Sequence, residues 1–303
     1  MNSEVTLTEV EDAAVETSRP GRFSIYAELT KARLTMLVLL TTLAGFLLGI
    51  QQNFNFLLLI NTLLGTALLA ASASALNQWM ERKWDSLMKR TNQRPLPAKH
   101  IRPIEALSFG IITAFSGTAY LFYMVNSIAA IVALSCLLTY LLIYTPLKRF
   151  TSLNTLIGAI PGALPPVIGW TAARGTWDTG AWILFGVLFF WQMPHFLSIA
   201  WLYREDYKQA GFRMLSNDDT SGKVTSRHAM VYCIALLFVS LLPMFTGMSG
   251  TIYLIGAFIF GLAFLSYCLR FMIQRTEPRA KALFLASVLY LPCLLALMIL
   301  NQV

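Results

Sequence analysis

The sequence predicts an all-α membrane protein, a polytopic bundle of nine transmembrane helices. Hydrophobic residues fill 56% of the 303 positions and charged residues only 13%, too little polar material to cover a water-soluble domain of this size. The apolar residues form runs of about 20, the length of helix that crosses a bilayer. Because these runs are continuous, they also exclude a membrane β-barrel, whose strands would alternate apolar and polar residues.

The N-terminal segment, residues 1–28, is expected to be a disordered cytoplasmic tail in front of one intramembrane domain over residues 29–303. It has no apolar core, so it is not a cleavable signal peptide, and its acidic residues exclude a mitochondrial transit peptide. The predicted location is therefore a bacterial inner membrane, crossed many times. The acidic residues of the segment are Glu4, Glu9, Glu11, Asp12, Glu16 and Glu28.

The nine predicted spans are apolar runs separated by polar loops, and the loops test their number. With nine spans, 22 of the 23 Lys and Arg residues fall on one side of the membrane and only Arg174 on the other. Basic residues concentrate in cytoplasmic loops, so the N-terminus is expected in the cytoplasm and the C-terminus outside. The spans cover residues 33–50, 57–80, 103–124, 128–146, 153–172, 180–201, 228–247, 251–270 and 282–300.

The net charge of +8 is mainly a signal of this orientation, so no binding of nucleic acid is expected. Two cytoplasmic loops, residues 81–102 and 203–227, are long and carry acidic as well as basic residues. Loops that stand on a rigid scaffold commonly carry function. The active site is therefore expected at the cytoplasmic mouth of the bundle.

The inner end of the second span carries three oxygen-bearing side chains at intervals of four. Asn77, Glu81 and Asp85 would lie on one face of a continuing helix, within an arc of about 80°. Two unpaired carboxylates at this spacing repel each other, and a divalent cation would reverse that effect. Carboxylate and amide oxygens with open positions suit Mg²⁺, which keeps waters or phosphate oxygens as its other ligands.

A basic cluster follows directly, with Lys89, Arg90 and Arg94. These side chains offer the charge-assisted donors that a diphosphate requires. The alternative is that the charges only solvate a helix end and set its orientation. Asn77 still lies within the predicted span, however, and polar residues inside a membrane indicate a functional site.

Four stretches then occur in a recognisable order over residues 25–300. They are Asn77-x-x-x-Glu81-x-x-x-Asp85 continuing to Arg94-Pro95-Leu96-Pro97, Tyr144 to Asn154, Gly158 to Trp170, and Trp191 to Phe196 with Glu205-Asp206-Tyr207 after it. The sequence thereby resembles the UbiA-type intramembrane prenyltransferases, in the form carried by their haem branch, the protohaem IX farnesyltransferases. Where the wider superfamily has aspartate, this chain has Glu81.

The resemblance implies a prenyltransferase that moves a farnesyl group from farnesyl diphosphate to a vinyl group of haem B and adds water, making haem O. It implies Mg²⁺ as cofactor, haem B as a substrate and the lipid bilayer as surroundings. A haem A synthase or a terminal oxidase assembly protein is the expected protein partner. Ionisation of the allylic diphosphate would depend on metal and cations that neutralise the leaving group.

The second half of the site is expected after the sixth span. The superfamily has paired aspartates four residues apart there, whereas this chain has the adjacent carboxylates Glu205 and Asp206. Asp206 is retained as a catalytic residue and metal ligand with Asn77, Glu81 and Asp85. The diphosphate is assigned to Lys89, Arg90, Arg94, Lys148, Arg149 and Lys208.

His195 is the remaining predicted catalytic residue. It lies about six residues before the inner end of the sixth span, roughly 10 Å deep and near the level of Asn77. A neutral imidazole there could ligate haem iron or act as general base for the added water. The alternative is a histidine hydrogen-bonded to a neighbouring helix.

Glycine, proline and tryptophan add three expectations about packing. Gly158 and Gly162 form a small-x-x-x-small pair that allows close helix contact. Pro161, Pro165, Pro166 and Pro194 would interrupt the backbone where a cavity is lined. The outer border is expected to carry an interfacial belt of Trp170, Trp177 and Trp182.

Two alternatives to this function stay open. A secondary transporter would also have broken helices, intramembrane polar residues and duplicated acidic loops. Its charges would be expected at the membrane midplane, whereas here they lie at one mouth beside a basic cluster. The other alternative is a UbiA-type prenyltransferase with an aromatic acceptor, against which Glu81 and the stretch from Trp191 to Phe196 favour haem.

Overall fold

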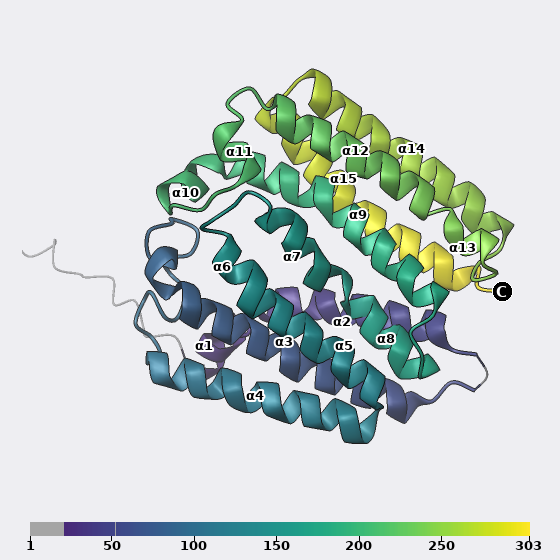
Figure 1. Cartoon of the computed structure of the whole chain (residues 1–303), viewed down its shortest axis with the longest axis horizontal. Coiled ribbons are helices and arrows are strands. Elements are labelled where there is room, and N and C mark those ends of the chain that lie inside the picture. The colour runs from purple at the N-terminus through teal and green to yellow at the C-terminus, as the bar shows by residue number, and fades with distance from the viewer. Residues whose placement is uncertain (1–20, 52) are drawn as a thin grey trace, which may run out of the picture.

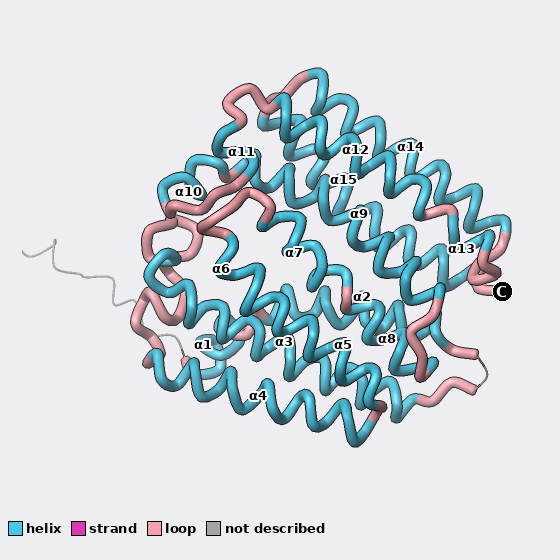
Figure 2. The backbone as a smooth tube through the Cα atoms, viewed as in Figure 1, coloured by secondary structure: helices cyan, strands magenta, loops and turns pink. Residues whose placement is uncertain are grey.

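The computed structural model describes residues 21–51 and 53–303. Within these residues the chain is helical, the helices are joined by loops and turns, and no strand is found (Figure 2). Nine of the helical segments found there are long and apolar enough to cross a membrane, and each coincides with a predicted span, which confirms the fold class. Of the predicted disordered tail, residues 1–20 lie outside the description, and residues 22–28 differ from the prediction because they are helical.

The first part of the chain forms four of the nine spans, each started or ended by local signals. Asn55 and Asn126 accept hydrogen bonds from backbone N–H groups three residues on and so cap two of the helices. The elements are α1 (Arg22–Leu29), α2 (Ala32–Gly49), α3 (Phe56–Asp85), α4 (Pro103–Met124), α5 (Ser127–Leu138), a π-helical segment (Thr139–Tyr144) and α6 (Thr145–Leu147).

The second part supplies the other five spans. The fifth is broken at Leu164, where Pro165 starts a new helix, as expected for Pro165 and Pro166. The expectation was wrong for Pro161 and Pro194, which lie inside continuous helices, because neighbouring groups can satisfy the backbone carbonyls that proline leaves free. The elements are α7 (Asn154–Ala163), α8 (Pro165–Arg174), α9 (Thr179–Leu202), α10 (Arg204–Gln209), α11 (Leu215–Asp218), α12 (Lys223–Val239), α13 (Leu242–Phe245), α14 (Thr251–Ile273) and α15 (Glu277–Leu300).

The helices form two groups that meet along α7 and α8 (Figure 1). In one group α3 packs against α4 and α2 packs against α8; in the other, α9 packs against α7, α12 and α15, and α14 covers α12 and α15. The short helices α6, α10 and α11 gather at one end of the bundle, and the C-terminus lies at the opposite end. We call the first of these the loop end.

Glycine allows the closest crossing, between α2 and α8. A Cβ on Gly45 would overlap the carbonyl of Pro166, and one on Gly169 would overlap the carbonyl of Thr42. Small residues in membrane helices serve this purpose, because they let two backbones approach. The predicted pair, Gly158 and Gly162, also allows close packing, but against side chains: Gly158 contacts the ring of Tyr144 and Gly162 contacts Gln192.

The predicted tryptophan belt is only partly present. Trp182 is 60% exposed, as expected of a residue that faces lipid. Trp170 is only 2% exposed, and its indole N–H donates to Asp178 at 3.0 Å, so it is a core residue. The reason is that its ring packs against Gly180 at the start of α9, which covers this face of α8.

Candidate active site

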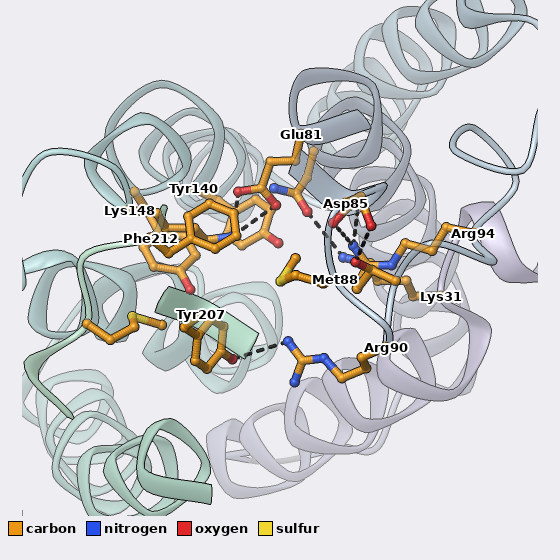
Figure 3. A pocket seen from close by; sticks show the side chains of 14 residues that line it. Lys31, Glu81, Asp85, Met88, Arg90, Arg94, Tyr140, Lys148, Tyr207 and Phe212 are labelled. Carbon is orange, nitrogen blue, oxygen red and sulfur yellow. Dashed lines mark hydrogen bonds and ion pairs between the residues drawn. The ribbon is translucent and has the colours of Figure 1, made fainter. Parts of the chain in front are cut away.

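A polar cavity of about 140 Å³ opens at the loop end of the bundle (Figure 3). It is smaller than the ~300–1,000 Å³ of pockets that enclose a whole drug-sized ligand, so it suits a head group rather than an entire lipid-like substrate. Its walls are Lys31, Asn77, Glu81, Asp85, Met88, Arg90, Thr91, Arg94, Tyr140, Tyr144, Lys148, Tyr207, Phe212 and Met214.

The oxygen-bearing wall is the last two turns of α3. Asn77, Glu81 and Asp85 lie on one face of this uninterrupted helix, and they are 1%, 5% and 1% exposed. Their oxygen atoms therefore point into the cavity and away from bulk solvent, as Figure 3 shows for the two carboxylates. Buried carboxylates require cationic partners or hydrogen-bond donors.

Each carboxylate has one cationic partner. Arg94 donates to both carboxylate oxygens of Asp85 at 2.8 Å. Lys148 donates to both carboxylate oxygens of Glu81, at 2.9 and 3.1 Å. Thr91 shapes the turn that returns Arg94 to the helix end, because its hydroxyl donates to the carbonyl of Asp85 at 2.7 Å.

Lys31 comes from the connection between α1 and α2, and its role was not predicted. Its Nζ donates to Oδ1 of Asn77 at 3.2 Å, and its backbone has a φ of 49°, a left-handed conformation that is uncommon outside glycine. Burial, together with the charges of Arg94 and Lys148, lowers the pKa of Lys31 to about 7. In the sequence it could be counted only as a basic residue before the first span.

The opposite wall comes from the irregular backbone after α5. The π-helical segment places Tyr140 and Tyr144 in the cavity, and π-helical turns are frequent at functional sites. Asn77 donates through Nδ2 to the Thr145 hydroxyl at 3.2 Å, which ties this wall to α3. Burial acts to lower the pKa of Lys148, but the Glu81 carboxylate outweighs it and raises that pKa.

The loop after α9 closes the cavity. Tyr207 of α10 lines it, and its hydroxyl accepts a hydrogen bond from Arg90 at 3.2 Å. The guanidinium of Arg90 also lies over the rings of Tyr203 and Tyr207, at 5.0 and 5.4 Å. Burial alone would lower the pKa of Arg90, but these neighbours raise it. Phe212, beyond Gly211, adds an apolar surface to this wall.

Six of the predicted site residues thus line one cavity: Asn77, Glu81, Asp85, Arg90, Arg94 and Lys148. Their roles in binding remain predictions.

Four other predicted residues lie around the cavity but do not line it. Lys89 and Lys208 are exposed, and the guanidinium of Arg149 lies 4.1 Å from the centre of the Trp84 ring. Asp206 is half-buried in α10, and its carboxylate lies close enough to Arg90 to help raise the pKa of Arg90. The adjacent Glu205 is exposed.

His195 does not line this cavity and lies against α15. Its Nδ1 is 2.7 Å from the hydroxyl of Ser287, and its ring lies beside those of Trp191 and Phe284. The alternative prediction for His195, a hydrogen bond to a neighbouring helix, is therefore present in the structure. Among the described residues, no hydrogen bond is found for the other ring nitrogen, Nε2.

The oxygen donors of the cavity fit a magnesium ion that takes its remaining ligands from a substrate or from water. In the part of the chain that is described, no three Asp, Glu, His or Cys side chains are close enough to form a metal cage. Asn77, Glu81 and Asp85 would supply an amide and two carboxylates, which leaves the remaining positions to waters or phosphate oxygens.

The charge of the cavity favours an anion. Its walls hold two carboxylates and four basic side chains, Lys31, Arg90, Arg94 and Lys148. Arg90, Arg94 and Lys148 alone outnumber the two carboxylates, so positive charge is in excess whatever the protonation state of Lys31. Basic side chains that converge on one small space are the usual recognition elements for phosphate groups.

Comparison with known proteins agrees with this geometry. The UbiA prenyltransferase family matches residues 38–291. A relative from Solibacter usitatus named Protoheme IX farnesyltransferase is 45% identical over 286 residues, which are 91% of this chain and 98% of that protein.

Solved structures share the fold. A digeranylgeranylglyceryl phosphate synthase superposes with a TM-score of 0.79 at 18% identity, over 92% of this chain and 98% of that one. A UbiA homologue from Archaeoglobus fulgidus, bound to DMAPP and Mg²⁺, has a TM-score of 0.66 at 17% identity, over 91% and 99% of the two chains.

Proposed function

Because the chain belongs to the UbiA prenyltransferase family, we propose that it transfers a farnesyl group from farnesyl diphosphate to a vinyl group of haem B, with addition of water, to make haem O. The observation that carries this proposal is the cavity in which Asn77, Glu81 and Asp85 face four basic side chains. The acceptor is inferred from the name of the Solibacter usitatus relative and from the four sequence stretches of the haem branch.

Mg²⁺ bound by Asn77, Glu81 and Asp85 would supply Lewis-acid stabilisation of the departing diphosphate. The chain's own residues act beside it. Arg90, Arg94 and Lys148 donate hydrogen bonds to the diphosphate oxygens as negative charge develops on them. Such preorganised donors in a site with little water are typically the largest contribution to catalysis.

The reaction follows from this arrangement. The bond between the first farnesyl carbon and the diphosphate oxygen breaks, and both electrons leave with the diphosphate. The vinyl group of the porphyrin attacks the farnesyl cation and forms a carbon–carbon bond. Water then adds to the cation left beside the porphyrin ring and loses a proton, which leaves a hydroxyl group there.

The surroundings of the cavity suit substrates with a charged head and an apolar body. The cavity itself is polar, while Tyr140, Tyr144, Met88 and Phe212 form its apolar parts. Aromatic faces next to the cavity can stabilise an allylic cation through their quadrupole.

The transporter alternative is less well supported, because the carboxylates lie at the end of α3 and not at its middle.

The cavity is proposed to face the cytoplasm of a bacterium, with the protein in the inner membrane. The argument is the distribution of basic residues, since the loops of the cavity end carry nearly all of them and the opposite end carries Arg174. A haem A synthase or a terminal oxidase assembly protein remains the predicted partner, because haem O has to be passed on.

The test is an assay of the purified protein in lipid nanodiscs with haem B, farnesyl diphosphate and Mg²⁺. Mass spectrometry should detect a porphyrin that has gained one farnesyl group and one water. Glu81→Gln and Asp85→Asn should each lower turnover by about 10²–10³-fold, the usual effect of removing one electrostatic contact to the leaving group.

A matched pair of lysines provides the control. Lys148→Gln, in the cavity, should lower turnover strongly, whereas Lys83→Gln, exposed in the last turn of α3 and outside the cavity lining, should leave it within about twofold. Absence of the farnesylated porphyrin, or prenylation of an aromatic acid in its place, would contradict the proposal.

A further inference from the structure

The three basic side chains that contact the polar face of α3 differ in how firmly they are held. Lys148 and Arg94 each donate to both oxygens of a carboxylate, which holds them by charge as well as by hydrogen bonds. Lys31 donates to the neutral amide oxygen of Asn77 at 3.2 Å. Of these three, Lys31 is therefore the side chain most readily available to a ligand.

Nζ of Lys31 has hydrogen-bond donors to spare. It carries three N–H groups as an ammonium and two as an amine. Among residues 21–51 and 53–303, its contact with Asn77 is the one hydrogen bond found for this atom. At least one N–H group remains in the cavity that Lys31 lines, where Figure 3 shows its side chain beside that of Arg94. A donor in such a place requires an acceptor, and a diphosphate brings several.

The backbone of Lys31 has an unfavourable conformation. Its φ of 49° and ψ of 54° lie in the left-handed region, where the Cβ atom of an L-residue is crowded by a carbonyl oxygen. Glycine would adopt this conformation freely. Strain of this kind persists where the surrounding structure imposes it, and it clusters at functional sites. Here it accompanies a turn between α1 and α2 that directs the Lys31 side chain to α3.

Gln78 is the part of α3 that holds this turn. Its side chain is 0% exposed, and Nε2 donates to the carbonyl oxygens of Glu28 and Leu29 at 3.1 and 2.8 Å. These belong to the last turn of α1, whose carbonyls lack partners within their own helix. Leu29 is also 0% exposed, in a buried cluster with residues of α3 and of the loop after it. Two adjacent residues of α3, Asn77 and Gln78, thus fix both Nζ of Lys31 and the backbone before it.

We propose that Lys31 is a further catalytic residue, whose Nζ donates a hydrogen bond to an oxygen of the departing diphosphate, and that Gln78 positions it. This proposal rests on the proposed function. As the bond between the farnesyl carbon and the diphosphate oxygen breaks, both electrons leave with the diphosphate. The N–H group of Lys31 stabilises the negative charge that develops, and no proton has to be transferred. The turn after α1, outside the nine spans, thereby completes the site.

A second lysine in the same backbone conformation provides a control. Lys99 has a φ of 59°, but it is exposed in the loop after α3 and does not line the cavity. Lys31 and Lys99 therefore share residue type and strain, and only Lys31 has a place in the site. Their glycine variants separate catalysis from backbone conformation.

The first test measures pyrophosphate binding without turnover. Inorganic pyrophosphate is titrated into the purified protein in nanodiscs with Mg²⁺, without farnesyl diphosphate or haem. Lys31→Met keeps the length of the side chain but has no donor, so its affinity for pyrophosphate should fall about 10–100-fold. In the farnesyl transfer assay its kcat should fall about 10²–10³-fold, with the KM for haem B unchanged. Lys31→Arg keeps a donor and should retain more of the kcat than Lys31→Met.

The second test compares Lys31→Gly with Lys99→Gly. Both variants relieve the left-handed strain, so neither should lower the thermal midpoint of unfolding. Turnover should be lost in Lys31→Gly and kept in Lys99→Gly. Added n-butylamine, which resembles the missing side chain, should restore part of the turnover of Lys31→Gly. It should have no such effect on Lys31→Met, because the methionine side chain fills the space.

The third test examines positioning by Gln78. Gln78→Leu removes the donor to the two carbonyls of α1 and should lower kcat in the wild type but not in the Lys31→Met background, because both residues act through one group. Equal losses in the two backgrounds would overturn the positioning role. Gln302→Leu is the matched control, since Gln302 donates to the carbonyl of Leu48 at the opposite end of the bundle. It should leave kcat unchanged.

The outcomes separate this proposal from the proposed function. Wild-type pyrophosphate affinity and kcat in Lys31→Met would overturn the role of Lys31 while farnesyl transfer stands. A wild type that makes no farnesylated haem would overturn the proposed function, and the pyrophosphate affinities would still decide the role of Lys31. A lower midpoint in Lys31→Gly but not in Lys99→Gly would make Lys31 structural and overturn the proposal. If Lys31→Met does not fold, Lys31→Gly with and without butylamine decides.

Discussion

Glu81 and Asp85 are each paired with a cation in this structure, and both cations also line the cavity. A carboxylate oxygen that binds Mg²⁺ gives one lone pair to the metal, and the charge of the metal weakens the salt bridge that the carboxylate makes. When the metal and the diphosphate bind together, Lys148 and Arg94 can exchange the carboxylates for phosphate oxygens. Each buried charge then keeps a partner, which avoids the large cost of an unpaired buried ion.

Magnesium alone should therefore bind weakly. It would meet an excess of positive charge and would compete with Lys148 and Arg94 for the carboxylates that pair with them. With inorganic pyrophosphate present, Mg²⁺ affinity should rise by about 5–150-fold, the usual range of coupling between two ligands. Isothermal titration with and without pyrophosphate measures this difference, and equal affinities would contradict the exchange.

Among the elements, the crossing of α2 and α8 is the tightest. Gly169 has no room for a methyl group because its neighbours are backbone atoms of α2, which cannot rotate away. Gly169→Ala should force the helices apart and lower the thermal midpoint in detergent by several degrees, as overpacking by one methyl typically costs about 1–3 kcal/mol.

Gly186→Ala is the matched control, since a methyl group there would meet one side-chain carbon of Val239 at 3.1 Å. Its midpoint should fall less than that of Gly169→Ala. Equal losses would show that the α2–α8 crossing is not the constraint that the geometry indicates.

The start of α12 depends on a carboxylate outside the membrane. Asp219 accepts hydrogen bonds from the backbone N–H groups of Lys223 and Thr225, at 3.1 and 2.7 Å. Burial alone would raise the pKa of Asp219, but these hydrogen bonds and that of Ser221 outweigh it and lower the pKa. The ionised form is therefore the one that stabilises the fold.

This contribution should depend on pH with a defined sign. Because the pKa is lower in the folded state, the stabilisation is complete above the unfolded pKa of about 3.9 and is lost as the pH falls through the folded value. Asp219→Asn should be less stable than the wild type at pH 6, by about 0.5–2 kcal/mol, and the difference should shrink below pH 4.

Thermal unfolding at a series of pH values measures this difference. Asp218→Asn, at the exposed neighbour, is the control and should follow the wild type throughout. A difference between Asp219→Asn and the wild type that did not change with pH would show that the charge of Asp219 is not involved.

At the scale of the whole molecule, nine spans put the two ends of the bundle on opposite sides of a membrane. Asn92 lies in the loop after α3 at the cavity end, and Val303 lies at the other end and is 85% exposed. If the cavity faces the cytoplasm, an impermeant thiol reagent on intact cells should label Val303→Cys and not Asn92→Cys. Permeabilised cells should label both, and the reverse pattern on intact cells would overturn the orientation.

The elements of the fold were largely predictable because they depend on local properties. A run of about 20 apolar residues has to become a helix in a bilayer, where every backbone group must be hydrogen-bonded within the chain. The interruption before Pro165 could be expected from proline, but Pro161 and Pro194 lie inside continuous helices, so proline alone does not decide where a span breaks. The burial of Trp170 could not be predicted, because it depends on how α8 packs against the start of α9.

By itself, the sequence determined that Asn77, Glu81 and Asp85 share one helix face, since a period of 3.6 residues places them there. Only the tertiary structure decided which cations meet them, bringing Lys31 and Lys148 from segments 46 and 67 residues away and leaving Lys89 and Lys208 outside. It likewise turned His195 toward Ser287, 92 residues further along the chain. The reason is that helix periodicity orients a side chain on its own helix, whereas its partners are chosen by the packing of helices far apart in sequence.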